Sequence, residues 1–478
     1  MVGGFWHWKA KKSERGSQGD SDEHYKKALS YLDSKKYEEA LNEINRAIEM
    51  NPNNETYHGK KAYILMHMKL YEEALKEYDK AIELNPENSE YHNEKGETLY
   101  HLNRYEEALK EYDKAIKLDP DEPDYHSNKG NALRSLDRYE EAVIEYDKAI
   151  RLEPKDPFTH YFKGIALSNL GLYDGAIKEY DIAIKLLPNI PFFYYDKGIA
   201  LSSEMRYKAA LKEYDKALKL DPENPDYHYI KGDALRHLGF LEGALEEYDR
   251  AIKLNPKNAF YHYSKGFVLE SLKRYKDALK EYDKATKLDP DDPDYHNNKG
   301  SLLEFFERYD EALEEINRAI ELNPNHASYH NNKGSILSHL KRYNEALKEY
   351  DKAIELNPEN SLYYRNKGVL LYKMGRYREA LKEYDKAIEL DPDDPEYYGD
   401  KGDALRSLER YEEALKEYDR AIKLDPDNTS YHYNRGVVLY NLERYSEALK
   451  EFEFIERLDP KNPEYRNMKE KALKALKK

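Results

Sequence analysis

The sequence predicts an all-α fold, namely an α-solenoid of thirteen 34-residue helix–turn–helix repeats with a helix that caps the C-terminal end. The first observation behind this prediction is that prolines recur at one constant interval, at Pro52, Pro86, Pro120 and onward to Pro460, without an insertion. The second is that each interval contains start and stop signals for two helices. A period of this length is typical of solenoids, in which each repeat buries its apolar face against its neighbours.

The repeat over residues 293–324 illustrates the two helices. Asp292 is a suitable N-cap and Pro293 suits the first helical position, so we expect a first helix from Pro293 to about Phe306. After a short turn, the segment YDEALEEINRAIEL begins with acidic residues, which favour a helix N-terminus. Pro324 then ends the second helix because proline cannot continue it.

Glycine occupies the middle of the first helix in eleven repeats, from Gly96 to Gly436. Glycine costs about 1 kcal/mol of helix propensity relative to alanine, so its repetition at one position indicates close packing. We expect the second helix to approach the first at this point through small residues such as Ala108 and Ala115.

The stretch YHNEKGETLYHLNRYEEALKEYDKAIKLDP, residues 91–120, resembles the tetratricopeptide repeat (TPR). The matching small and aromatic positions are Gly96, Tyr105, Ala108, Tyr112, Ala115 and Pro120. The resemblance extends over residues 18–478 and implies a right-handed superhelix whose first helices line an inner groove. It divides the chain into an N-terminal tail (residues 1–20), thirteen repeats (21–459) and a C-terminal capping helix (460–478).

Two positions depart from the family pattern. The residue before the glycine is usually leucine in the family, whereas here it is a lysine such as Lys95 or, in the last repeat, Arg435. We expect these side chains to lay their stems on apolar surface and to keep their charged heads in water.

The family's usual tryptophan position is histidine in ten repeats. We expect these histidines to be buried, neutral packing residues with a lowered pKa. They are His24, His58, His92, His126, His160, His228, His262, His296, His330 and His432.

We expect no metal site, no cofactor and no enzymatic activity. Equivalent histidines of stacked repeats lie about 8–10 Å apart, whereas zinc–nitrogen bonds are about 2 Å, so one ion cannot bridge them. Acidic runs such as DPDDPDY, residues 289–295, lack the spacing and central glycine of calcium loops. The sequence has no phosphate-binding glycine loop, no HExxH motif and no nucleophile elbow. The constant repeat length also leaves no inserted loop to carry a catalytic group.

The composition argues against two classes of partner. The net charge is −16 and the pI about 5.6, so the phosphate backbone of a nucleic acid would be repelled. The mean hydropathy is −1.02 and no stretch approaches 18 apolar residues, so we expect no membrane span.

The N-terminal residues lack the apolar core of a secretory signal, and we expect a cytoplasmic protein. Cysteine is absent, which excludes disulfides and thiolate sites.

The segment NIPFFYYDKGIAL, residues 189–201, contains four consecutive aromatic residues in a chain that is 36% charged. Phe193 and Tyr194 occupy ordinary packing positions, so we expect them in the core. Phe192, Tyr195 and Ile199 share another helix face because they are spaced i, i+3 and i+7. With their equivalents in neighbouring repeats they form a predicted aromatic strip facing the groove: Phe158, Tyr161, Ile165, Phe192, Tyr195, Ile199, Tyr229, Phe260, Tyr263 and Phe267. Either this strip contacts a partner, or its rings pack on one another in a tight groove.

Asparagine recurs at a second position of the first helix, at Asn128, Asn298, Asn332, Asn366 and Asn434. A similar asparagine ladder lines the groove in some members of the family. A carboxamide can both donate and accept a hydrogen bond, so such a ladder can pair with the main chain of an extended peptide. The alternative is that these are ordinary solvated residues of a helix surface.

These patterns together predict a scaffold that binds an extended peptide or a partner helix in the concave groove. The alternative hypothesis is a structural protein that self-associates end to end into a rod or filament, which would make it a homo-oligomer. Phe5, Trp6 and Trp8 in the N-terminal tail are relevant to both. Large rings are unfavourable in water, at about 1.5–3 kcal/mol each, so we expect this tail to dock on the first repeat or on a neighbouring molecule.

Overall fold

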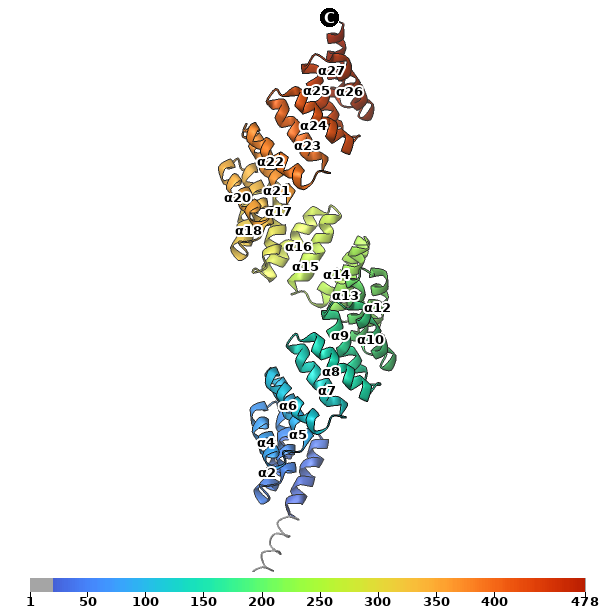
Figure 1. Cartoon of the computed structure of the whole chain (residues 1–478), viewed down its shortest axis with the longest axis vertical. Coiled ribbons are helices and arrows are strands. Elements are labelled where there is room, and N and C mark those ends of the chain that lie inside the picture. Colours follow the sequence, from blue (N-terminus) through green and yellow to red (C-terminus); the bar gives the residue numbers. More distant parts are fainter. Residues whose placement is uncertain (1–19, 478) are drawn as a thin grey trace, which may run out of the picture. The chain divides into compact units, whose positions relative to one another are not determined.

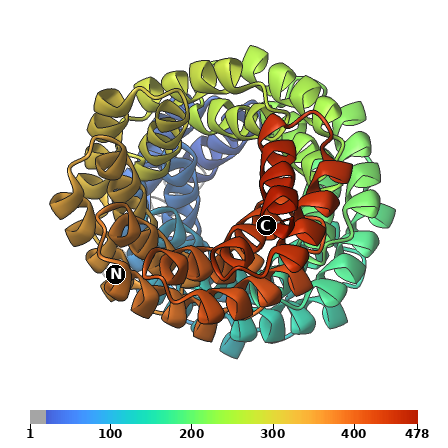
Figure 2. The same cartoon turned by 90° about the horizontal axis from the view of Figure 1, so that it is seen from above.

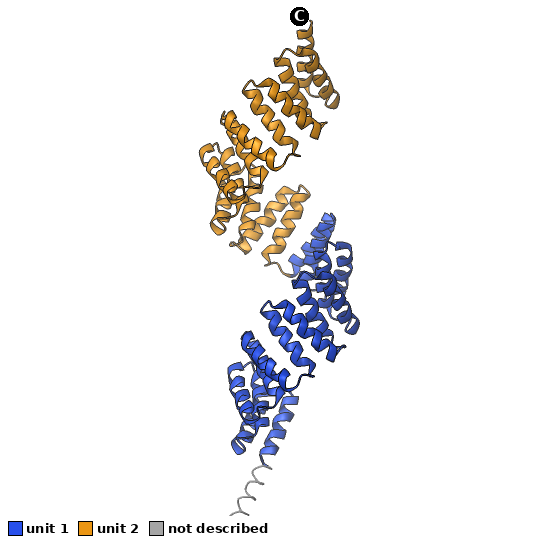
Figure 3. Ribbon diagram, viewed as in Figure 1, with its two compact units in different colours: residues 1–254 blue, residues 255–478 orange. Residues whose placement is uncertain are grey.

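The computed structural model describes residues 20–477, and within that range the chain consists of helices and short turns with no strand (Figure 1). The helices form two compact units, which divide the chain after Leu254 (Figure 3). Unit 1 is residues 1–254 and unit 2 is residues 255–478. Each unit is a row of helix pairs, as the repeat pattern predicts.

Unit 1 contains a helix over residues 20–33, then α2 (Tyr37–Met50), α3 (Glu55–His67), α4 (Tyr71–Leu84), α5 (Ser89–His101), α6 (Tyr105–Leu118), α7 (Pro123–Ser135), α8 (Tyr139–Leu152), α9 (Pro157–Asn169), α10 (Tyr173–Leu186), α11 (Pro191–Ser203), α12 (Tyr207–Leu220), α13 (Pro225–His237) and α14 (Leu241–Leu254). Unit 2 contains α15 (Ala259–Ser271), α16 (Tyr275–Leu288), α17 (Pro293–Phe305), α18 (Tyr309–Leu322), α19 (Ala327–His339), α20 (Tyr343–Leu356), α21 (Ser361–Lys373), α22 (Tyr377–Leu390), α23 (Pro395–Ser407), α24 (Tyr411–Leu424), α25 (Thr429–Asn441), α26 (Tyr445–Leu458) and α27 (Pro463–Leu476).

The ends of the helices follow from local signals in each repeat. At α17 the Asp292 carboxylate accepts a hydrogen bond of 2.9 Å from the backbone N–H of Asp294, as the sequence predicts for an N-cap. At the end of α11 the chain reverses at Met205, whose φ is 58°, and the backbone N–H of Arg206 then bonds to the carbonyl of Leu201 at 2.9 Å. This left-handed turn satisfies the last carbonyls of the first helix and directs the chain into the second helix.

The glycine of the first helix faces a tyrosine ring of the second helix. A Cβ placed on Gly96 would lie 2.6 Å from Cε1 of Tyr112, which is almost completely buried. Ala108 and Ala115 are fully buried nearby, but the space left by the glycine is filled by the tyrosine ring. The expectation of close packing is therefore confirmed, and the group that lies against the glycine is the ring of Tyr112.

Figure 2 shows an inner and an outer layer of helices, and the contacts between alternate helices indicate that the first helices form the inner, concave side of each unit. The contacts between alternate helices join first helices to one another, such as α3 with α5 in unit 1 and α19 with α21 in unit 2. At the end of unit 2, α27 covers α26, with Ala472 fully buried and Tyr465 and Met468 packed against the cluster that contains Phe452. We call the side formed by the first helices the concave face.

Candidate functional site

The part of the predicted aromatic strip that belongs to unit 1 lies on α9, α11 and α13. Phe158 is 41% exposed, whereas Phe193 is fully buried, which confirms the predicted core position of Phe193. The Phe192 ring is half-buried, with its centroid 5.0 Å from that of Phe193. Ile165, Tyr195, Ile199 and Tyr229 are also half-buried, and the Tyr195 ring lies 4.9 Å from the ring of Tyr227. These residues retain exposed surface on the concave face.

Tyr161 differs from the rest of this group because it is buried, at 9% exposed. Its ring contacts the rings of Phe192 and Phe193 at centroid distances of 5.0 Å and 4.9 Å. Its hydroxyl donates a hydrogen bond to the carboxylate of Asp196 in the next repeat. Burial raises the pKa of Asp196, and the bond from Tyr161 partly opposes that rise. Tyr161 is therefore a packing residue that supports Phe192.

In unit 2 the strip continues as Phe260, Tyr263 and Phe267 on α15. Phe260 is 46% exposed and Phe267 is 45% exposed. The Tyr263 ring packs 4.8 Å from the ring of Tyr295 in the next repeat. Its hydroxyl accepts a hydrogen bond of 2.9 Å from the carboxamide nitrogen of Asn298. These contacts attach the aromatic residues of α15 to the asparagines of α17.

The asparagines of unit 2 form one continuous chain of hydrogen bonds, which we call the amide chain. It consists of Asn366, Asn331, Asn332, Asn297 and Asn298, and it ends on the hydroxyl of Tyr263. From Asn366 to Asn298, each carboxamide donates from Nδ2 to the Oδ1 of the next, at 2.9, 3.3, 2.9 and 3.1 Å. Hydrogen-bonded amides that point the same way polarise one another, so this chain is a preorganised polar row across four repeats.

The remaining asparagines make the same kind of bond between repeats. Asn128 donates to Asn93 at 3.1 Å in unit 1, and Asn434 donates to Asp403 at 3.0 Å in unit 2. We did not predict Asn297 and Asn331 as site residues, although they are members of the amide chain. The signal was present in the sequence as the pairs Asn297–Asn298 and Asn331–Asn332, which place a donor and an acceptor at consecutive positions.

Beside the amide chain, the concave face of unit 2 has a polar hollow of about 270 Å³ between α21, α23 and α25. Arg365 bridges its acidic residues, with the guanidinium 2.8 Å from the carboxylate of Asp400. Burial raises the pKa of Asp400 and of Asp403, and in each case a neighbouring group partly opposes the rise. The hollow exists because Gly399 has no side chain, and a Cβ there would lie 2.5 Å from the ring of Tyr431.

The histidines bond to glutamates, which corrects the expectation of rings that only pack. In all ten repeats the Nδ1 atom lies within hydrogen-bond distance of a glutamate of the second helix, as in His296–Glu315 at 2.6 Å. The Nε2 atom of His296 is also 3.0 Å from the carbonyl of Pro290. The bond to Glu315 raises the pKa of His296, burial opposes it, and the Pro290 carbonyl adds to the rise. The expected lowering of the pKa is wrong for His160, His296, His330 and His432, because both ring nitrogens of each face acceptors and the pKa is raised.

The lysines before the glycines are ion-paired as well, which corrects the expectation that their heads lie in water. Lys95 Nζ lies 3.1 Å from Glu111 of its own repeat and 2.7 Å from Asp79 of the preceding repeat. Lys129 bridges Glu145 and Asp113 in the same way, at 3.2 Å and 2.8 Å. Each of these two lysines therefore connects two repeats and neutralises the glutamate that bonds the histidine.

Phe5, Trp6 and Trp8 lie outside the described residues. Among residues 20–477, no helix combines the length and hydrophobicity needed to cross a lipid bilayer. The same residues contain no group of three or more histidine, aspartate or glutamate side chains placed to hold a metal ion.

Family models match most of the chain. Models described as TPR repeat match residues 96–134, 130–171, 271–304, 334–375 and 402–443. Models described as tetratricopeptide repeat match residues 25–89, 195–259, 361–394, 77–110, 315–348, 383–416 and 293–326. No curated protein matches the chain in sequence.

Similar solved structures include Cut9 in the APC/C hetero-tetramer Cut9–Hcn1, which is 15% identical. The match covers 95% of this chain and 96% of that one, with a TM-score of 0.47. Yeast Tom70 is 18% identical over 88% of this chain and 95% of its own, with a TM-score of 0.41. MamA (41-end) from Desulfovibrio magneticus RS-1 is 29% identical over 35% of this chain and 95% of its own, with a TM-score of 0.34.

Proposed function

Because the chain belongs to the tetratricopeptide repeat family, we propose that it is an interaction scaffold that binds an extended peptide segment of a partner protein on its concave face. The proposal assigns the main-chain contacts to the amide chain of unit 2. It assigns the apolar contacts to the exposed aromatic residues of the same unit, Phe260 and Phe267.

The observation that carries this proposal is the amide chain. Each carboxamide has two N–H groups and two lone pairs, and the links along the chain use only some of them. The Oδ1 atom of Asn366 accepts no hydrogen bond from another described residue, which leaves an acceptor at one end of the row. Successive repeats are about 10 Å apart, which is the length of about three residues of extended peptide. A row of amides at this spacing is suited to the polar groups of a main chain.

The aromatic residues of α15 lie directly at the other end of the amide chain, through the bond from Asn298 to Tyr263. A peptide that follows the amides would therefore bring one of its side chains to Phe260 and Phe267. Partly exposed aromatic residues beside a polar row are typical of binding surfaces, in which a few rings supply most of the free energy. We accordingly expect the partner peptide to carry an apolar side chain at that end.

The proposal is tested with a short fluorescent peptide that contains one phenylalanine in an alanine-rich sequence. Asn366→Ala should weaken binding about fivefold, since one hydrogen bond contributes about 1 kcal/mol. Phe260→Ala should weaken it more, by about thirtyfold for an anchor contribution of about 2 kcal/mol. Asn344→Ala is the matched control, because Asn344 is exposed on the second helix α20 and away from the concave face.

A second probe tests the main-chain contact itself. Methylation of alternate backbone nitrogens of the peptide should abolish the effect of Asn366→Ala, because the methylated main chain cannot donate. If the two asparagine variants bind the unmodified peptide equally well, the amide chain is a structural element only. If the peptide does not bind, and light scattering shows particles that lengthen with protein concentration, the self-associating rod replaces the scaffold.

A further inference from the structure

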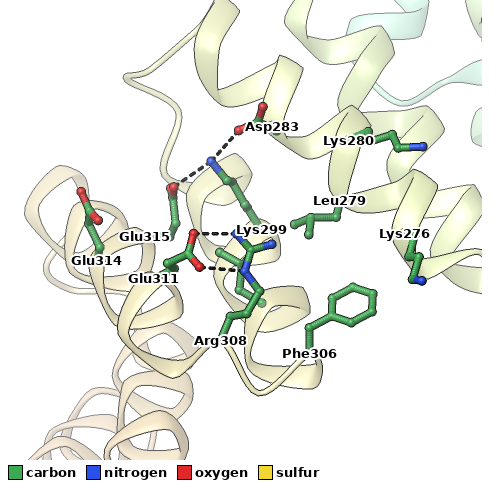
Figure 4. A pocket seen from close by; sticks show the side chains of 11 residues that line it. Lys276, Leu279, Lys280, Asp283, Lys299, Phe306, Arg308, Glu311, Glu314 and Glu315 are labelled. Carbon is green, nitrogen blue, oxygen red and sulfur yellow. Dashed lines mark hydrogen bonds and ion pairs between the residues drawn. The ribbon is translucent and has the colours of Figure 1, made fainter.

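A second hollow lies on the outer side of unit 2, among α16, α17 and α18, and has a volume of about 700 Å³ (Figure 4). Leu279 and Leu303 are its aliphatic residues, and Phe306 adds an aromatic ring. A smaller hollow of about 340 Å³ adjoins it and shares Phe306 and Lys276. Phe306 therefore lies between two cavities on the side of the unit opposite to the concave face.

The same groove in unit 1 provides an internal comparison, since it lies five repeats earlier in the chain. It is lined by residues of α6, α7 and α8 and has a volume of about 360 Å³. Three positions differ in character: Lys276 stands where unit 1 has Glu106, Phe306 where it has Leu136, and Glu314 where it has Ile144. These replacements make the groove of unit 2 larger, more aromatic and cationic on one wall.

The charges of the groove are separated between its walls. Figure 4 shows Lys276, Lys280 and Phe306 on one side of the pocket, with Glu311, Glu314 and Glu315 on the other. Two of these glutamates are already neutralised, because Glu315 lies 2.8 Å from Lys299 and Glu311 lies 2.6 Å from Arg308. On the wall near Phe306, Lys280 is also paired, at 3.0 Å from Asp277, so the positive charge that this wall offers is that of Lys276.

Among the cations that line this groove, Lys276 is the one for which the described part of the chain provides no ion pair. In unit 1 the equivalent glutamate, Glu106, faces Arg138 at 3.7 Å. Here the equivalent position is Lys276, which has the same sign as Arg308, and Lys276 forms no ion pair with any described residue. The adjoining hollow is lined by Lys273, Arg274 and Asp277, and Asp277 pairs with Arg274 at 3.5 Å, so Lys273 and Lys276 supply the positive charge beside Phe306. In a chain with a net charge of −16, this is a local basic surface beside an apolar floor.

We propose that this outer groove binds an acidic segment of a partner protein, which places a carboxylate at Lys276 and an apolar side chain against Phe306. Electrostatic complementarity selects the acidic partner, and the ring provides the apolar contact. A nucleic acid fits poorly, because the opposite wall carries Glu314 and the whole chain is acidic. A second copy of this chain is disfavoured by repulsion between two molecules of net charge −16. This site is independent of the function proposed for the concave face.

The test uses the full-length protein and a labelled peptide of glutamates with a central tryptophan–leucine pair. The variants K276E and F306L install the residues of the equivalent groove in unit 1, so both are compatible with the fold. K276E should weaken binding about tenfold and remove most of its salt dependence. F306L should weaken it about fivefold. The thermal midpoint of K276E should be unchanged or higher, because a glutamate at this position can face Arg308 as Glu106 faces Arg138.

A gain of function completes the design. The double variant E106K/L136F installs the same two residues in unit 1, and it should raise the peptide stoichiometry from one to two. The proposal is overturned if the peptide does not bind the wild-type protein, or if K276E and F306L leave its affinity unchanged. Equal binding of an all-glutamate peptide would also overturn it, because Phe306 would then have no part in recognition. Dimerisation that K276E abolishes would identify a second copy as the occupant instead.

Discussion

The contact between the first-helix glycine and the second-helix tyrosine gives a quantitative test at Gly198. A Cβ on Gly198 would lie 2.2 Å from Cε1, 2.7 Å from Cδ1 and 2.9 Å from Cζ of Tyr214, whereas ordinary contact begins at 3.4 Å. The ring has little room to move, because Tyr214 is fully buried and its hydroxyl lies 3.0 Å from Ser202 Oγ. Gly198→Ala therefore requires α11 and α12 to separate.

The size of the effect follows from two opposing contributions. Overpacking a close-packed core costs about 1–3 kcal/mol, and a contact this short belongs at the upper end. Alanine regains about 1 kcal/mol of helix propensity. We expect a net destabilisation of about 2 kcal/mol for Gly198→Ala. The matched control is Gly175→Ala in the neighbouring helix α10, where the nearest atom to the new Cβ is a methyl of Leu167 at 3.4 Å. That variant should be stabilised by about 0.5–1 kcal/mol.

The assay is hydrogen exchange resolved by helix, because a solenoid opens locally and its repeats contribute separately to stability. Exchange in α11 and α12 should accelerate about thirtyfold in Gly198→Ala and slow slightly in α10 of Gly175→Ala. The change in exchange rate for Gly300→Ala should lie between those of Gly198→Ala and Gly175→Ala, because the new Cβ would meet the flexible side chain of Ile316 at 2.8 Å. If Gly198→Ala exchanges as slowly as the wild type, the tyrosine ring does not fix the spacing of the two helices.

Two further predictions concern the ion pairs and the turns. The bond to glutamate raises the pKa of His296 and His330 above 6.5, so their contribution to stability is complete below that pH and is lost as the pH rises through the raised pKa. Burial raises the pKa of Glu281, but hydrogen bonds and charges from His262, Lys284 and Lys265 outweigh this effect and lower the pKa to about 2. The contribution of Glu281 to the stability of the fold is therefore lost as the pH falls from about 4.5 towards 2. The thermal midpoint should therefore be highest between these two pH ranges, and it should be lower at pH 8 than at pH 6. A higher thermal midpoint at pH 8 would contradict the raised pKa of His296 and His330. At the turns, Met205→Gly should stabilise unit 1 by about 1 kcal/mol because Met205 has a left-handed φ of 58°, whereas Gly239→Ala, at a φ of 80°, should destabilise it by a similar amount. The denaturant midpoints of Met205→Gly and Gly239→Ala measure these changes in stability, and midpoints equal to that of the wild type would show that the turns are unstrained.

The helices were predictable because their signals lie within a few residues of one another. The N-cap Asp292, the start of α17 at Pro293 and the span of α18 all coincide with the sequence prediction. Thirteen copies in one phase reinforce each signal, so an error in one repeat would conflict with the others. The residues that depart from the pattern, such as Phe193 within four aromatic residues, were also placed correctly, since helical spacing assigns each of them to a face.

What was missed depends on contacts between helices. The glutamate that bonds each histidine lies on the other helix of the repeat, as for His296 and Glu315, and the helical spacing alone does not show that the two side chains meet. The burial of Tyr161 depends on how the ring of Phe192 in the next repeat covers it. The amide chain depends on the rotation between successive first helices. For these features the sequence shows which residues are present but not the relative orientation that brings them together.

The bridging lysines imply that this chain can change length in whole repeats. If residues 309–342 were deleted, Arg308 would be followed by Tyr343, and Glu349 would occupy the position of Glu315 beside His296 and Lys299. The lysine and histidine bonds around this junction would then find equivalent partners. A gene that encodes such a protein can lose or gain one repeat unit by unequal recombination and still encode a folded chain. Such an event would shift or delete the groove around Phe306 and the amide chain. Selection on the number of repeats therefore acts on binding more than on folding.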